Sequence, residues 1–145
     1  VVGCGSGCFG CCVDEITVWQ SEADRIATYV RAAKVSIEVG AVGGCALLLN
    51  GRCQVYAARP YVCRSQGAVL AFFDGEQDRR DTCPEHLEGL DLAALPESAV
   101  FELGPAEQEL ASIASQELGE RSGRGLPERV SLRELATRLA KSPVG

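Results

Sequence analysis

The distribution of cysteine constrains this chain more than any other feature. The chain has eight cysteines among 145 residues, and all of them lie in the first 83 positions. A set of this size implies disulfides, metal ligation or burial as small apolar side chains. The eight residues are Cys4, Cys8, Cys11, Cys12, Cys45, Cys53, Cys63 and Cys83.

Ligation of a metal or an iron–sulfur cluster by thiolates is the interpretation that we favour. Disulfide scaffolds are usually shorter and poorer in apolar residues, whereas 46% of this chain is apolar, which is enough for a core of its own. Burial alone explains one or two thiols but not eight. Because His86 is the single histidine, sulfur must be the main ligand of any metal. The alternative is four disulfides in a secreted protein.

Charge and hydropathy argue against other classes of function. The chain carries 14 basic and 20 acidic side chains, a net charge of −6, and the basic ones are scattered, so we expect no nucleic-acid partner. No run reaches 18 apolar residues, so we also expect no membrane-spanning helix. We expect a cytoplasmic protein.

The first group of cysteines is a glycine-rich segment, Cys4-x3-Cys8-x2-Cys11-Cys12. Glycine lets the backbone fold tightly, so these thiolates can converge on one centre from a single loop. Radical S-adenosylmethionine enzymes use the same CxxxCxxC spacing to hold a [4Fe–4S] cluster, but 145 residues are too few for their β/α barrel. Because adjacent side chains diverge, Cys11 and Cys12 need not serve the same metal.

The second group must be assembled by tertiary structure, and it consists of Cys45, Cys53, Cys63 and Cys83. Asn50-Gly51 between two apolar runs predicts a β-hairpin with Cys45 and Cys53 on opposite arms. Pro60 ends the second arm, so Cys63 follows in a turn or short helix. Two groups of four allow two tetrathiolate sites, or one cluster and one separate ion. Tetrahedral sulfur ligation suits zinc and iron–sulfur centres.

Three arginines, Arg52, Arg59 and Arg64, lie close in the sequence to Cys53 and Cys63. Four thiolates on Zn²⁺ or on a [4Fe–4S]²⁺ core leave a charge of about −2, whose burial requires nearby donors or cations. We therefore predict that Arg59 and Arg64 act beside the bound group. Ordinary surface ion pairing is the alternative.

His86 follows Cys83 by three residues, so its imidazole is a candidate extra ligand. A solitary histidine is more often a surface or capping residue.

The local patterns predict an α+β fold, a small irregular metal-stapled domain with a β-hairpin and three to four helices. We expect a cysteine-cluster metal-binding domain over residues 1–87 and a helical C-terminal extension over 88–145 that packs on it. The expected elements are a strand at 16–19, a helix at 21–34 capped by Ser21, a strand or helix at 68–73, a polar loop at 74–81, a helix from Pro105 to about 119, a linker at 120–129 and a last helix capped by Ser131 with Glu134.

The last helix has one apolar face, formed by Leu132, Leu135, Ala136 and Leu139. We expect this face to pack on the rest of the chain. Docking on a protein partner or a second copy is the alternative.

The motifs together resemble the YkgJ-type CxxCxxCC cysteine-cluster family. The resemblance rests on CGSGCFGCCV, on GGCALLLNGRCQVYAARPYVCRSQG and on a later cysteine, over about residues 4–83. It implies a zinc- or iron-chelating role for all eight cysteines, with Tyr56, Arg59, Pro60 and Arg64 in the family's Arg-Pro block. One departure is Ala46, where the family often has proline.

The resemblance implies metal binding but no reaction. The members of the family that the chain resembles are mostly small bacterial proteins. Flagellin lysine N-methylases, which are associated with a [4Fe–4S] centre, contain a related region. We therefore favour an iron–sulfur protein with a redox or radical and methyl-transfer-related role. The alternatives are a zinc protein with one or two structural thiolate sites, or an enzyme such as a protein-modifying methyltransferase. No Rossmann fingerprint is present, and a shared fold does not supply a reaction.

Overall fold

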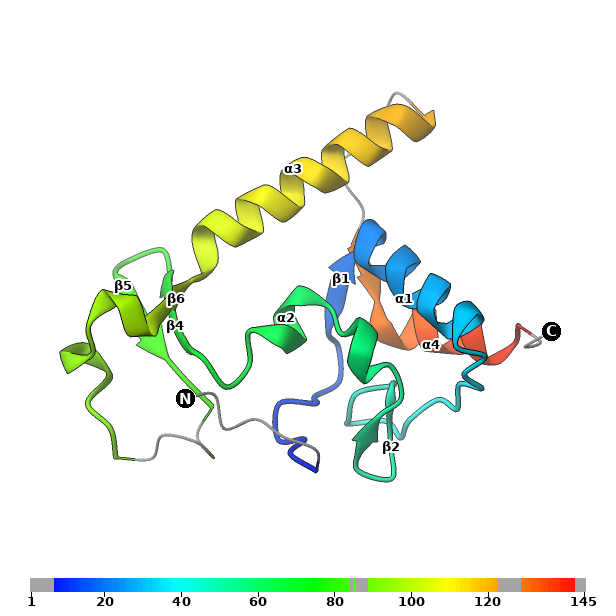
Figure 1. Cartoon of the computed structure of the whole chain (residues 1–145), viewed down its shortest axis with the longest axis horizontal. Coiled ribbons are helices and arrows are strands. Elements are labelled where there is room, and N and C mark those ends of the chain that lie inside the picture. The colour runs from blue at the N-terminus through cyan, green and yellow to red at the C-terminus, as the bar shows by residue number, and fades with distance from the viewer. Residues whose placement is uncertain (1–6, 84, 86–88, 123–128, 143–145) are drawn as a thin grey trace.

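The computed structural model describes residues 7–83, 85, 89–122 and 129–142 as a mixture of short strands and helices (Figure 1). The α+β class predicted from the sequence is confirmed. The elements are β1 (Thr17–Trp19), α1 (Gln20–Ala32), β2 (Leu48–Leu49), β3 (Arg52–Cys53), α2 (Tyr61–Arg64), β4 (Val69–Phe73), β5 (Asp78–Asp81), β6 (Val100–Glu102), α3 (Leu103–Ser122), β7 (Arg129–Ser131) and α4 (Leu132–Ala140), with short 3-10 turns at Tyr56–Ala58, Leu92–Ala94 and Glu97–Ala99.

The core joins the two ends of the chain. β1 pairs antiparallel with β7, so that Val18 lies opposite Val130, and both side chains are buried. Helices α1 and α4 pack beside this pair. The buried set is Val18, Ala23, Ile26, Val30, Ile37, Cys45, Ala46, Leu47, Val55, Ala58, Val130, Leu132, Leu135, Ala136 and Leu139. The last five belong to the C-terminal segment, which therefore forms part of the main core.

Helix α1 begins one residue before the predicted start, so Ser21 is not its N-cap. Trp19 occupies that position, and its backbone N–H donates to Glu22 Oε2 at 3.1 Å. The other oxygen of Glu22 accepts the backbone N–H of Tyr61 at 2.7 Å. One carboxylate thus satisfies a donor at the start of α1 and a donor at the start of α2, and it fixes the position of the short helix that carries Cys63.

The hairpin predicted at Asn50-Gly51 is present as β2 and β3. Asn50 and Gly51 have φ values of 49° and 71°, which a two-residue turn of this kind requires and which asparagine and glycine adopt at low cost. Cys53 lies on the arm β3, as predicted, opposite Leu48. Cys45 does not lie on the other arm, because β2 begins only at Leu48 and a turn at 46–47 separates Cys45 from it.

A three-stranded sheet has the order β5–β4–β6. The apolar run at 68–73 is the strand β4, whereas the polar segment at 74–81 is a loop only in its first half, because β5 pairs with β4. The prediction of a loop was wrong because β5 is an edge strand of charged residues, DRRD, and lacks apolar alternation. β6 adds to the other side of β4 in parallel.

Helix α3 begins at Leu103, two residues before the predicted start, and continues to Ser122. Pro105 lies in its first turn, where a missing N–H leaves no bond unmade. In Figure 1 the helix runs from the β4–β5–β6 sheet toward α1, and it contacts both β4 and α1.

The predicted N-cap and buried face of α4 are confirmed, whereas the contact of Glu134 in the predicted capping box stays a prediction. Ser131 is the N-cap and its side chain accepts the Arg133 backbone N–H at 3.2 Å, while all four residues of the predicted apolar face are buried. In the part of the chain that the structure describes, no helix is both long and apolar enough to cross a membrane.

Candidate metal centre

Six cysteines line one cavity of about 290 Å³, although they come from four separate segments. Three lie on the loop before β1, one precedes β2, one is on β3 and one is on α2. They are Cys8, Cys11, Cys12, Cys45, Cys53 and Cys63. The two groups of the sequence are therefore merged, because the hairpin and α2 bring their thiols to the N-terminal loop.

The other two cysteines differ. Cys83 is buried but does not line this cavity, and Cys4 lies outside the described residues, as does His86. Of the described thiols, Cys12, Cys45, Cys53, Cys63 and Cys83 are not in disulfides.

Backbone hydrogen bonds join the two loops that carry most of these thiols. The N–H of Cys45 donates to the carbonyl of Cys12 at 2.9 Å, and Val13 forms a β-bridge with Gly44. Because these contacts involve the cysteine backbones themselves, the positions of Cys12 and Cys45 are set together.

The Arg-Pro turn is held by side chains that bind its carbonyl groups. The Arg59 carbonyl accepts from Arg64 Nε at 2.8 Å and from Arg25 Nη2 at 2.6 Å, and Arg64 Nη2 also binds the Ala57 carbonyl at 2.8 Å. The Arg59 guanidinium lies 3.7 Å from the centre of the Tyr56 ring and lines the cavity. Of the three arginines singled out in the sequence, Arg52 and Arg59 thus contribute to the cavity wall, and Arg64 positions the turn behind it.

Burial and the neighbouring thiols both raise the pKa of two of the cysteines. Burial, and then the neighbouring Cys11, Cys45 and Cys53, raise the pKa of Cys12 from 9.0 to about 12. Burial also raises the pKa of Cys63 to about 12, with contributions from the same three cysteines and from Cys12. Without a cation these thiols therefore hold their protons at neutral pH, because thiolates packed together would repel one another.

Cys53 has groups beside it that favour the thiolate. Burial raises its pKa, and Cys45 adds to that effect. The Val55 backbone N–H and the Arg59 guanidinium act in the opposite direction. A hydrogen-bond donor and a cation next to sulfur are the groups that stabilise an anionic metal–thiolate centre.

The donor set fits a group that prefers sulfur, such as zinc or an iron–sulfur cluster. Four sulfurs about 2.3 Å from one zinc ion would lie within about 4 Å of each other. Among the described residues, no three Cys, His, Asp or Glu side chains are arranged to hold a single metal ion. The thiols instead surround a space about ten times the ~30 Å³ that one water molecule takes up in the liquid.

Comparison with protein families matches residues 3–86 to a family model named CxxCxxCC and described as "Putative zinc- or iron-chelating domain". The chain belongs to this family. The match covers more than half of the chain and includes all eight cysteines. Comparisons with curated proteins and with solved structures gave no significant match.

An arginine beyond the CxxCxxCC segment binds both loops of the cavity. Arg133 on α4 donates to both carboxylate oxygens of Asp14, at 3.0 and 2.9 Å. It also donates to the carbonyls of Gly40, Ala41 and Gly44 at 3.0, 3.0 and 2.8 Å. Asp14 lies two residues after Cys12, and Gly44 precedes Cys45. The C-terminal helix therefore braces the CxxCxxCC domain next to two of its thiols.

Asp14 is held as a carboxylate by these contacts. The Arg133 guanidinium, followed by the backbone N–H groups of Gly43 and Glu15, lowers its pKa from 3.8 to about 2. Sequence reasoning found neither Asp14 nor Arg133, because their pairing spans 119 positions and no local pattern indicates it.

Proposed function

We propose that this chain holds an iron–sulfur centre, of the [4Fe–4S] type, on thiolates drawn from the cavity. The observation that carries this proposal is that six cysteines surround a cavity of about 290 Å³ instead of converging on one point. A cluster several atoms wide needs its thiolate ligands further apart than one zinc ion does. The ligands are expected among Cys11, Cys12, Cys45, Cys53 and Cys63, whose thiols interact with one another.

The surroundings of the thiols suit a centre with net negative charge. Arg52 and Arg59 line the cavity, and the Val55 N–H donates to the Cys53 sulfur. When bound, such a centre supplies one-electron transfer, and hydrogen bonds to its sulfurs tune its reduction potential. A redox role or a part in radical or methyl-transfer chemistry is the use that we propose for it. A reducing compartment such as the cytoplasm would keep the thiols available.

Zinc is the second candidate, and a different observation favours it. β2 and β3 have two residues each, and α2 has four, so the segments that carry Cys45, Cys53 and Cys63 contain little regular structure. A zinc ion bound by four of the thiols would link these segments and stabilise the fold without any catalysis.

Metal analysis after anaerobic purification distinguishes the two candidates. About four irons and four acid-labile sulfides per chain, with a brown colour, are the result expected for a [4Fe–4S] centre. One or two zinc ions without sulfide would replace the iron–sulfur proposal with the zinc one. A metal-free protein with its thiols oxidised to disulfides would overturn both.

A further inference from the structure

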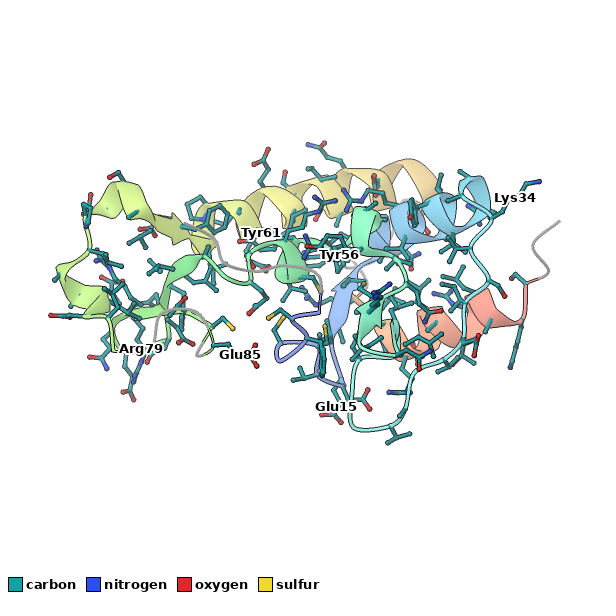
Figure 2. All side chains as sticks on the ribbon, turned by 60° about the horizontal axis from the view of Figure 1, so that its bottom comes forward. Glu15, Lys34, Tyr56, Tyr61, Arg79 and Glu85 are labelled. Atoms are coloured by element: carbon teal, nitrogen blue, oxygen red, sulfur yellow. The ribbon has the colours of Figure 1, made fainter. Side chains whose placement is uncertain are left out.

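A carboxylate from the end of the CxxCxxCC segment reaches the first described cysteine. The Cys8 thiol donates a hydrogen bond to Glu85 Oε2 at 3.2 Å, across 77 positions of the sequence. Figure 2 shows Glu85 next to the loop that carries Cys8, with Glu15 at a different place on the same loop. Since Cys8 also lines the cavity, Glu85 lies at its rim.

The loop is shaped to admit this carboxylate. A Cβ atom on Gly10 would lie 2.7 Å from Glu85 Oε1 and 3.1 Å from its Cδ. The first distance is too short for a Cβ contact and the second is at the lower limit, so any side chain at position 10 would displace the Glu85 side chain. The close approach of Glu85 to Cys8 therefore depends on glycine at this position.

The cavity wall and its rim differ in charge. Arg52 and Arg59 line the wall, and none of the described lining residues is acidic. Guanidinium groups stabilise a bound anionic centre but repel a metal cation that approaches it. Glu85 is exposed, and in the described part of the chain no Lys or Arg forms an ion pair with it. Because Glu85 is exposed, an ion that approaches from solvent can reach its carboxylate.

We propose that Glu85 and Cys8 form a capture site, which first binds incoming Fe²⁺ or Zn²⁺ at the rim and then passes it to the thiols inside. The cation binds a Glu85 oxygen and takes the place of the Cys8 thiol proton, which leaves to water. Thiols of the cavity then replace the carboxylate, and each releases its proton to water as it becomes a thiolate ligand, because sulfur is the preferred ligand of these metals in such a site. This inference rests on the proposed metal-binding function and concerns the rate of loading.

Uptake of Co²⁺ by the metal-free, reduced full-length protein tests the proposal, because thiolate-to-cobalt absorption reports each step directly. Glu85→Gln keeps an oxygen that can accept the Cys8 hydrogen bond but removes the charge. Glu15→Gln removes the same charge elsewhere on the loop and is the matched control. We expect Glu85→Gln to slow uptake about tenfold at low salt, with less effect at high salt, and to reach the same final absorbance.

Three results would overturn the capture role. Uptake by Glu85→Gln at the rate of Glu15→Gln would show that the carboxylate does not recruit the ion. A lower final absorbance would make Glu85 a permanent ligand instead. If the unaltered protein takes up no cobalt, the capture role fails because no free divalent ion is bound, whereas the proposed function is judged separately by the iron and sulfide content. The first two results leave the proposed function intact.

Discussion

At the scale of single residues, the thiols of Cys12 and Cys63 stay protonated because they are partly buried beside other thiols. The pKa values of Cys12 and Cys63, both about 12, are raised by burial first and by the other cysteines second. A bound cation reverses both effects, because it stabilises thiolates and shields them from one another. The same crowding that keeps these metal-free thiols neutral therefore means that each of them must release a proton when it becomes a metal ligand.

Substitution of single cysteines should separate cavity thiols from the others. Cys63→Ser removes a thiol that interacts with four others, and we expect it to lose more than about half of the bound metal. Cys83→Ser is the control, because Cys83 is buried and does not line the cavity. We expect this variant to keep its bound metal. Metal analysis of both variants is the measurement. Equal losses would place Cys83 among the ligands, as the sequence predicts.

Metal affinity should rise with pH. Because the folded pKa of Cys12 and Cys63 lies near 12, each thiol that becomes a ligand must release a proton at neutral pH. Each released proton should strengthen the apparent affinity about tenfold per pH unit. Zinc titrations of the metal-free protein at two pH values, in buffers of different ionisation enthalpy, would count the protons. An affinity that does not change with pH would contradict thiol ligation.

At the scale of elements, the loops that carry cysteine have little regular structure and depend on contacts from helices. Glu22 of α1 binds the first N–H of α2, and Arg133 of α4 binds the two loops around Cys12 and Cys45. Both helices are anchored by buried apolar faces, so they are fixed supports for the loops. The brace from α4 is the more extensive of the two.

Arg133→Lys should loosen the metal centre. Lysine keeps the charge but cannot reach both Asp14 oxygens and three carbonyls at once. We expect a lower melting temperature and a several-fold faster loss of metal to a chelator. Arg138→Lys is the control, because Arg138 is exposed on the same helix. Asp14→Asn should act similarly, and the double variant should be little worse than either single one. Additive effects would show that the two residues act separately.

The pair Arg133–Asp14 should stop stabilising the fold at low pH. The Asp14 pKa is lowered from 3.8 to about 2, so the interaction stabilises the fold fully above pH 3.8 and is lost as the pH falls through 2. Thermal unfolding of the metal-free protein across this range should show the loss. In the Arg133→Lys variant, the loss of stability on acidification should begin at a higher pH. An unchanged profile of melting temperature against pH would contradict a role of the Arg133–Asp14 pair.

At the scale of the whole molecule, the CxxCxxCC segment depends on the C-terminal part of the chain. The family match ends at residue 86, yet β7 pairs with β1 and α4 supplies part of the main core. Leu132 even lines the cysteine cavity. We therefore expect the stability of the core and the retention of metal to change together.

Leu135→Ala tests this coupling. Leu135 is 3% exposed, so its truncation should cost about 2–4 kcal/mol and lower the melting temperature by several degrees. Metal retention should fall as well, although Leu135 does not line the cavity. Ile113→Ala is the control, because Ile113 is 40% exposed on α3. If metal retention were unchanged at the lower stability, the site would be independent of the C-terminal core.

The sequence by itself determined the donor chemistry, the hairpin and the last helix. Sulfur as the main donor that the chain can offer a metal follows from eight cysteines and one histidine, the turn follows from Asn50-Gly51, and the buried face of α4 follows from its apolar spacing. These features were predictable because they depend on residue type or on neighbours within a few positions.

Only the tertiary structure decided which thiols share a cavity and what holds them there. Cys11 and Cys12 lie with Cys45, Cys53 and Cys63 because hydrogen bonds and packing join segments that are far apart in the sequence. The pairs Arg133–Asp14 and Glu85–Cys8 span 119 and 77 positions. No local pattern encodes such contacts, because their free energy arises only when the core has brought the segments together.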